Sequence, residues 1–181
     1  SSDVCSSDLN DLSKNKIENA INSEKSFREL YNHYAPFVWR TAFRTANGNS
    51  DIAEQVVQTV FISVHKNLKK FNYNSSFSTW IYKIAFRESV HLVKRERASN
   101  KRDTQLSGLE KATKEHHFNE EEIKNIIASL TVKDRFLLIS RELDGFSFSE
   151  LAEITGKKEG ALRVKLNRIK AKLREELKDE Q

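Results

Sequence analysis

Five glycines and one proline, Pro36, are the only residues of these two types in this chain of 181 residues. An all-β protein needs many tight turns, and Gly and Pro supply most of the backbone conformations that such turns require. Their scarcity predicts a mostly helical protein. The length fits one ordinary domain or two small ones.

Composition narrows the class of protein further. Hydrophobic residues make up 38% of the chain and charged residues 31%, as is typical of a soluble globular protein. No apolar run approaches the roughly 20 residues of a membrane-spanning helix, and no segment resembles a secretory signal. The one cysteine, Cys5, cannot form an internal disulfide. We therefore expect a cytoplasmic protein.

The first nine residues differ from the rest of the chain. They repeat Ser-Ser-Asp after five residues, and the chain has no methionine, not even at position 1. We interpret residues 1–9 as a leader that is not native to the folded domain or is disordered.

Two amphipathic helices are predicted in the first half. Apolar residues recur at helical spacing over 27–43, and Asn-Gly-Asn-Ser at 47–50 ends this pattern. Asp51 is predicted to cap a second helix whose apolar face extends to Leu68.

A polar loop and a basic helix follow. Residues 71–77 have no helical period and are rich in Asn and Ser, so we predict a loop. Ser78 or Thr79 is predicted to cap a third helix that contains Trp80 and carries five basic and two acidic residues between Lys83 and Arg97.

Apolar residues become rare between Ala98 and Asn119. We interpret residues 98–119 as a linker between a first domain at 10–97 and a second at 120–181. Periodicity resumes over 123–130, breaks at Thr131 and Val132, and continues from Phe136 to Leu143. The predicted fold is therefore all-α, with two small helical domains joined by a flexible linker.

The second domain ends in a helix-turn-helix pattern. Ser147 and Glu150 fit a capping box at the start of a short helix that stops at Gly156. A long helix follows from about Lys158. A residue that tolerates positive φ at the corner and an apolar anchor, Leu162, are what the motif needs.

The last helix has one buried and one basic face when it is placed on a helical wheel. The predicted buried stripe is Leu162, Leu166, Ile169, Leu173 and Leu177. Small and polar residues on the opposite face permit close approach to the major groove and contacts with base edges and phosphates. The predicted duplex-DNA contacts are Lys158, Gly160, Arg163, Val164, Lys165, Asn167 and Arg168. The alternative is the solvated face of a terminal packing helix.

The polar loop and the third helix give a second nucleic-acid signal. Tyr73, Phe77, Trp80 and Tyr82 alternate with basic residues, a composition that suits the stacking of unpaired bases. The alternative is that Phe77 and Trp80 belong to the core.

Five stretches carry a resemblance to a known family. They are Phe-Arg-Glu-Leu-Tyr at 27–31, Asp-Ile-Ala-Glu at 51–54 with Gln58 and Phe61, Phe-Ser-Thr-Trp-Ile-Tyr-Lys-Ile-Ala at 77–85, Ile-Ala-Ser-Leu at 127–130, and Phe-Ser-Phe-Ser-Glu-Leu-Ala-Glu-Ile at 146–154. In this order and spacing the chain resembles the extracytoplasmic-function sigma factors of bacterial RNA polymerase over about residues 27–177.

The resemblance implies a sigma region 2 and a sigma region 4, with core RNA polymerase and promoter DNA as partners. It implies that region 2 binds polymerase through Asp51, Glu54, Gln55, Gln58 and Phe61. Region 2 would also melt the minus-ten element through Asn72, Tyr73, Asn74, Ser75, Ser76, Trp80, Lys83, Arg87, His91, Lys94 and Arg95. The last helix would read the minus-thirty-five element. The family is often held inactive by an anti-sigma factor, which is therefore an expected partner.

This chain departs from the family pattern at several positions. Gln55 and Thr59 stand where acidic residues are common, and Arg87 and His91 stand where Asn and Asp are common. Thr131 replaces the usual Pro after Ser-Leu. The first pair of residues affects the expected polymerase contact, and the second pair affects the expected minus-ten preference. Thr131 affects the expected helix start.

Three other classes of protein are alternatives to a sigma factor. An enzyme is disfavoured because the chain has no phosphate-binding glycine loop, no metal-binding helix motif and no activated nucleophile, and His116-His117 reads as a solvated pair. We therefore expect no cofactor, metal, catalytic residue or small-molecule substrate. A polymerase-independent helix-turn-helix regulator and a protein-binding adaptor remain alternatives.

The placement of charge is more informative than the net charge of +5. Residues 83–102 carry +5 and residues 157–174 carry +7, so the rest of the chain carries −7. This predicts two basic, DNA-facing segments on an acidic body.

Overall fold

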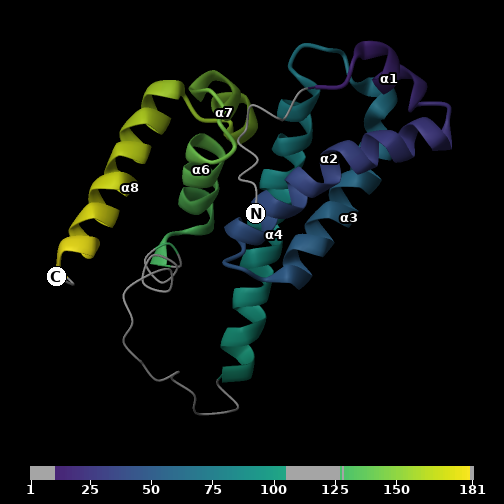
Figure 1. The fold of residues 1–181 in the computed structure, drawn as a ribbon. Coiled ribbons are helices and arrows are strands. Elements are labelled where there is room, and N and C mark those ends of the chain that lie inside the picture. The colour runs from purple at the N-terminus through teal and green to yellow at the C-terminus, as the bar shows by residue number, and fades with distance from the viewer. Residues whose placement is uncertain (1–10, 105–126, 128, 180–181) are drawn as a thin grey trace, which may run out of the picture.

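The computed structural model describes residues 11–104, 127 and 129–179, and within them every regular element is a helix (Figure 1). The elements are α1 (Lys14–Asn19), α2 (Glu24–Thr45), α3 (Ser50–Asn67), a 3₁₀ turn η2 (Leu68–Lys70), α4 (Phe77–Thr104), α6 (Val132–Glu142), α7 (Phe148–Thr155) and α8 (Glu159–Asp179). The all-α prediction is confirmed for this part of the chain. None of its helices is long and apolar enough to cross a membrane.

Helices α2, α3 and α4 pack side by side and form the core of the first half. The break predicted at 47–50 separates α2 from α3. The cap of α3, however, is Asn49, whose side chain accepts a hydrogen bond from the Ile52 amide at 2.9 Å. The prediction of Asp51 as the cap was wrong, and Asp51 instead places its negative charge in the first turn.

The start of α4 is held by two side chains, one local and one distant. The predicted caps Ser78 and Thr79 lie inside the helix, because Ser76 accepts from the Thr79 amide at 3.0 Å. Asp11 accepts from the amides of Phe77 at 2.7 Å and of Ser78 at 2.9 Å. An anion at a helix N-terminus accepts hydrogen bonds from the free amides and interacts favourably with the positive end of the helix dipole. The short N-terminal segment is thus tied to the helix predicted to bind the minus-ten element.

The predicted linker begins later than its composition indicated. Helix α4 continues to Thr104, so residues 98–104 are helical. They contain neither Gly nor Pro, the two residues that most disfavour the interior of a helix. The remainder of the predicted linker and most of the periodic segment 123–130 lie outside the described residues.

The second half matches the predicted pattern at α7 and departs from it in α6. Thr131 caps α6 by accepting from the Asp134 amide at 3.2 Å. The capping box of α7 is present, and Gly156 ends that helix at φ 70°. The predicted continuation of the apolar face to Leu143 was wrong: α6 ends at Glu142 and Leu143 is exposed.

The two halves pack against each other, which the sequence did not predict. The ring of Tyr82 lies 4.5 Å from that of Phe146, and the ring of Phe86 lies 4.8 Å from that of Phe136. Helices α6 and α7 thereby contact α2 and α4, and α8 lies on the outer edge beyond them (Figure 1).

Candidate nucleic-acid interface

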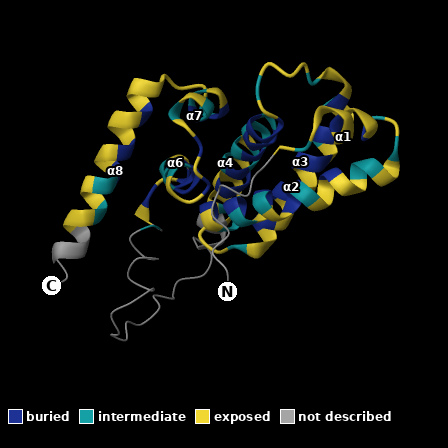
Figure 2. Cartoon of the chain, turned by 45° about the horizontal axis from the view of Figure 1, so that its top comes forward, coloured by how far each residue is buried: buried dark blue, intermediate teal, exposed yellow. Residues whose placement is uncertain are grey.

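Helix α8 presents the predicted DNA-contacting residues to solvent. Leu162, Leu166 and Ile169 are buried against α6 and α7, and Leu173 is partly buried. The opposite face is exposed, as Figure 2 shows. All seven predicted contacts are exposed: Lys158, Gly160, Arg163, Val164, Lys165, Asn167 and Arg168. Of the predicted stripe, the side chain of Leu177 lies outside the described part.

One exposed apolar residue is informative on this face. Val164 is 51% exposed although it lies among polar and basic neighbours. An apolar side chain at such a position can contact the methyl group of thymine in the major groove. The exposed face thus combines hydrogen-bond donors with an apolar contact.

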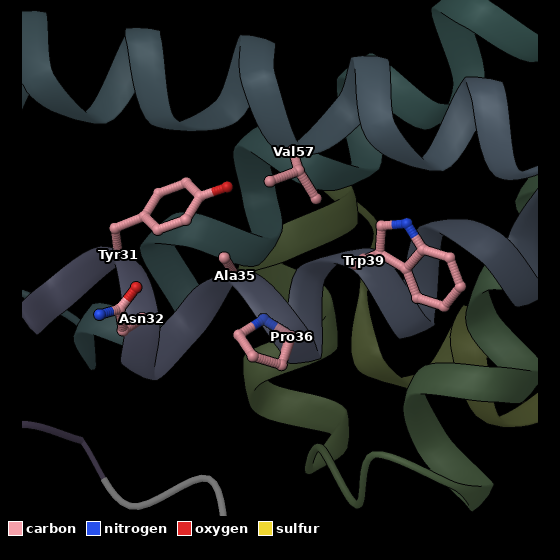
Figure 3. A pocket seen from close by; sticks show the side chains of 6 residues that line it. All are labelled: Tyr31, Asn32, Ala35, Pro36, Trp39 and Val57. Carbon is pink, nitrogen blue, oxygen red and sulfur yellow. The ribbon is translucent and has the colours of Figure 1, made fainter. Parts of the chain in front are cut away.

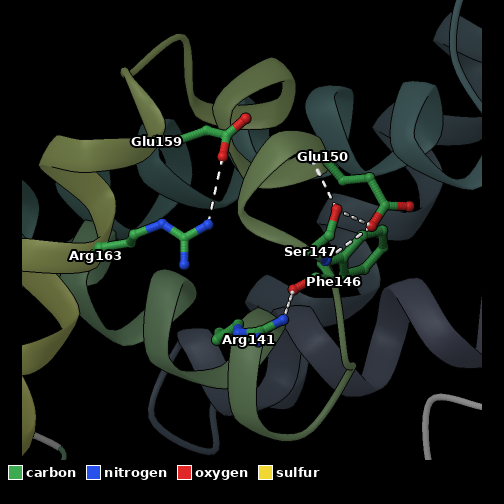
Figure 4. A network of polar contacts seen from close by, with 6 residues as sticks. All are labelled: Arg141, Phe146, Ser147, Glu150, Glu159 and Arg163. Carbon is green, nitrogen blue, oxygen red and sulfur yellow. Dashed lines mark hydrogen bonds and ion pairs between the residues drawn. The ribbon is translucent and has the colours of Figure 1, made fainter.

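Ion pairs hold the flanks of α8. Lys165 pairs with Asp134 at 3.0 Å and Lys170 pairs with Glu142 at 2.9 Å, both across to α6. Arg163 pairs with Glu159 at 3.6 Å within α8 (Figure 4). Exposed pairs contribute little to stability. Their consequence here is orientation, because they hold Lys165 and Lys170 toward α6.

The polar loop surrounds an aromatic cluster. The ring of Phe71 lies 4.7 Å from Tyr73, 5.1 Å from Phe77 and 5.2 Å from Trp80. Phe77 is fully buried and Trp80 is partly buried, so both contribute to packing. Tyr73 is exposed at φ 60°, a strained conformation for a bulky residue. The exposed ring that this loop presents is therefore Tyr73.

The other predicted minus-ten residues lie on this loop and along α4. Exposed residues are Asn72, Asn74, Ser76, Arg87, His91, Lys94 and Arg95, whereas Ser75 and Lys83 are partly exposed. Arg95 donates to the Gln55 side chain on α3 at 3.1 Å. The structure therefore joins the predicted DNA-binding and polymerase-binding residues at this point.

The predicted polymerase-binding helix α3 has an apolar groove beside it. Asp51, Glu54, Gln55 and Gln58 are exposed. Phe61 is only 4% exposed and meets Tyr31 edge to face, with the ring centres 4.7 Å apart. The groove is lined by Phe27, Tyr31, Gln58, Phe61, Ile62, His65 and Lys66.

A second shallow pocket continues this apolar surface along α2. Tyr31 and Trp39 lie on either side of Pro36 and Val57 in Figure 3. Tyr31, Trp39 and Ile62 are exposed. Sequence reasoning missed these three, although Ile62 falls outside the buried stripe of its helix and could have been found on a helical wheel.

A buried polar network joins the two halves. The Thr41 hydroxyl of α2 donates to Asp144 Oδ2 at 2.7 Å, and the Tyr82 hydroxyl of α4 lies 3.2 Å from Thr41 Oγ1. Burial raises the pKa of Asp144 above its ordinary value, while the Thr41 hydrogen bond and the charges of Arg40 and Arg44 oppose that rise. Burial also raises the pKa of Tyr82. A charge-bearing group thus lies inside the contact between the halves.

No cluster of three metal-ligating side chains occurs among the described residues. His116 and His117, the histidine pair interpreted as solvated, lie outside them.

Comparison with known proteins assigns each half. Residues 30–99 match the family model of sigma-70 region 2, and residues 120–173 match that of sigma-70 region 4. The ECF RNA polymerase sigma-E factor of Escherichia coli is 30% identical over 64% of this chain and 68% of its own length. The ECF RNA polymerase sigma factor SigW of Bacillus subtilis is 23% identical over 86% of this chain and 91% of its own.

Solved structures share the fold. The sigma factor RpoE from Bartonella quintana, solved with the anti-sigma factor NepR, covers 87% of this chain and 99% of its own at 22% identity and a TM-score of 0.65. CnrH, solved with the cytosolic domain of CnrY, covers 92% of this chain and 97% of its own at 18% identity and a TM-score of 0.68. With the sequence relatives, these findings show that the chain belongs to the extracytoplasmic-function sigma factors of the sigma-70 family.

Proposed function

We propose that this sigma factor recognises its promoters through two separate surfaces, one on each half of the chain. The exposed face of α8 reads the minus-thirty-five element as duplex, and the 72–76 loop with α4 melts and holds the minus-ten element. The observation that carries the first assignment is the exposure of all seven predicted contacts opposite a buried leucine stripe. The protein acts by binding, in the cytoplasm where polymerase works, and the polymerase supplies the catalysis.

We propose that the minus-ten surface works by trapping unpaired bases. Tyr73 offers an exposed ring, and the basic residues of α4 beside it suit a single-stranded backbone. Duplex DNA hides the base faces on which such a ring stacks. A surface of this kind therefore favours the melted state.

We propose that polymerase docks on α3 and on the apolar surface that α3 shares with α2. Exposed aromatic side chains beside polar ones are typical of protein interfaces. Tyr31, Trp39 and Ile62 supply the apolar part, and Glu54 and Gln58 supply the polar part. Phe61 is buried, so it supports the Tyr31 ring by packing against it and offers little surface of its own to polymerase.

The two DNA-binding surfaces must separate in order to act together. Elements about 25 base pairs apart span about 85 Å of duplex. The two halves are instead in direct ring contact through Tyr82 and Phe146. Binding at both elements therefore requires the halves to move apart. We further propose that an anti-sigma partner controls the protein, as both solved relatives named above were captured with such a partner or a cytosolic domain.

Run-off transcription with core RNA polymerase tests the function. Arg163→Ala or Arg168→Ala should lower initiation at promoters that depend on the minus-thirty-five element, since a base-specific arginine contact is worth roughly 1–3 kcal/mol. Polymerase binding should be unchanged. Lys25→Ala, which removes an exposed charge at the start of α2, is the matched control. Loss of polymerase binding in either arginine variant would mean that α8 is misassigned.

The polymerase-independent regulator is not favoured. It would need a sensing or dimerisation domain in the first half, where the match is to sigma-70 region 2. Binding to duplex promoter DNA by the protein alone, as tight as that of the holoenzyme, would support it.

A further inference from the structure

Phe148, the first residue of α7, lies beside two guanidinium groups. The Cζ of Arg141 is 4.8 Å from the centre of its ring, and the Cζ of Arg163 is 4.4 Å from it. We propose that Phe148 is a positioning residue that holds the Arg163 guanidinium for contact with the minus-thirty-five element. This inference rests on the proposed function, because it takes α8 as the helix that reads that element.

Phe148 is itself held firmly. Ser147 accepts from the Glu150 amide at 3.2 Å, and Glu150 accepts from the Ser147 amide at 2.8 Å, which fixes the backbone on both sides of Phe148. Arg141 donates to the Phe146 carbonyl at 2.7 Å (Figure 4). The Phe148 ring is partly buried and packs against the core. The ring is therefore a fixed surface on which a mobile side chain can rest.

Arg163 needs such a support. Its side chain is 59% exposed, and its pair with Glu159 spans 3.6 Å. An exposed arginine has many rotamers and loses their entropy when it binds. A guanidinium that lies over an aromatic ring keeps its N–H edge available for a base or a phosphate. The ring thus restricts Arg163 before DNA arrives without consuming its donors.

A helix-turn-helix motif does not by itself require that Phe148 position Arg163. The alternative is a packing role, in which Phe148, the residue after the cap, packs α7 against the core and does nothing else. The two roles predict different dependence on Arg163: a packing role acts on the whole domain, whereas a positioning role acts only through the guanidinium.

The test is a double-mutant cycle in reconstituted holoenzyme. Run-off transcription is compared on two promoters that differ only in an intact or a scrambled minus-thirty-five element. Phe148→Leu should lower the intact-to-scrambled ratio about two- to fivefold, the range of an exposed cation–π contact. In an Arg163→Ala background the same substitution should leave the ratio unchanged. Phe148→Tyr, which keeps the ring, should retain the wild-type ratio.

Phe37→Leu is the matched control. Phe37 is also partly buried on a helix, with the Arg40 guanidinium 5.0 Å from its ring, but it lies on α2. It should leave the promoter ratio unchanged. Urea midpoints are measured for each variant, and Phe148→Met replaces Phe148→Leu if the leucine variant does not fold.

Two results would overturn the inference while leaving the proposed function intact. One is an Arg163→Ala defect with no defect in Phe148→Leu. The other is a Phe148→Leu defect of the same size with or without Arg163, which would show a packing role. If Arg163→Ala itself does not change the ratio, the proposed minus-thirty-five contact fails, and the positioning role fails with it.

Discussion

Replacing Thr41 with Val is expected to separate the two halves of this sigma factor. Thr41 is 1% exposed on α2, and its hydroxyl donates to Asp144 of the other half at 2.7 Å. Val has nearly the same shape but no hydroxyl. The substitution therefore removes the donor to a buried carboxylate while it changes the packing little. In the separated state water solvates Asp144, so the loss falls on the packed state alone.

The size of the effect follows from this one contact. A hydrogen bond to a charged group contributes about 1.5–3 kcal/mol. Since every 1.4 kcal/mol is a factor of ten, the ratio of separated to packed molecules should rise about 10- to 150-fold. Thr45→Val is the matched control. Thr45 is fully buried one turn further along α2, and its hydroxyl has no hydrogen-bond partner among the described residues.

Single-molecule Förster transfer measures this ratio. Dyes are placed on Ser50→Cys and Glu153→Cys, exposed positions on α3 and α7, in a Cys5→Ser background. A urea series brings both populations into view. Thr41→Val should enlarge the low-transfer population, whereas Thr45→Val should match the parent protein. Equal populations in these two variants would refute the idea that the Thr41–Asp144 contact holds the halves together.

Three further substitutions test other parts of the structure. Burial raises the pKa of Asp144 above its ordinary 3.8, so packing of the halves should be strongest below that pH and weaken as pH rises through the raised value. Asp144→Asn should abolish this dependence in the same transfer assay, and a persistent wild-type profile would contradict it. Asp11→Asn should lower the unfolding free energy by about 1–2 kcal/mol, because the α4 amides lose a charged acceptor; an unchanged urea midpoint would argue against it. Gly156→Ala should cost about 1–2 kcal/mol from positive φ alone, since nothing lies within 4 Å of the added carbon. An unchanged urea midpoint for Gly156→Ala would mean that the α7–α8 corner relaxes to accommodate the added carbon.

Features that depend on residues close together in the chain were predicted well. Ser147 and Glu150 form the predicted capping box, Gly156 adopts the predicted positive φ, and Leu162 and Leu166 are buried. Each depends on contacts within one or two helical turns, where spacing alone decides the outcome. The errors at local scale were small. Asn49 caps α3 two residues before Asp51, and Ser76 caps α4 two residues before Ser78, because several polar residues compete at each site.

Contacts between residues far apart in the chain could not be predicted from the spacing of residues in the sequence. Asp11 meets the start of α4 from 66 residues away, and Thr41 meets Asp144 from 103 residues away. Lys165, which the helical wheel placed among the predicted DNA contacts, pairs with Asp134 of α6. Each depends on which helices come together.

By itself, the sequence determined that this chain is helical, that a capping box and a glycine corner bound α7, and which face of α8 is basic, because helical periodicity and capping are local. Only the tertiary structure decided that the two halves close on each other over a buried carboxylate and that Phe148 lies under Arg163. These arrangements come from the packing of apolar faces, which are not directional, so many pairings of helices satisfy the same pattern. The particular pairing is fixed by the fit of side chains such as Tyr82 against Phe146 and Phe86 against Phe136.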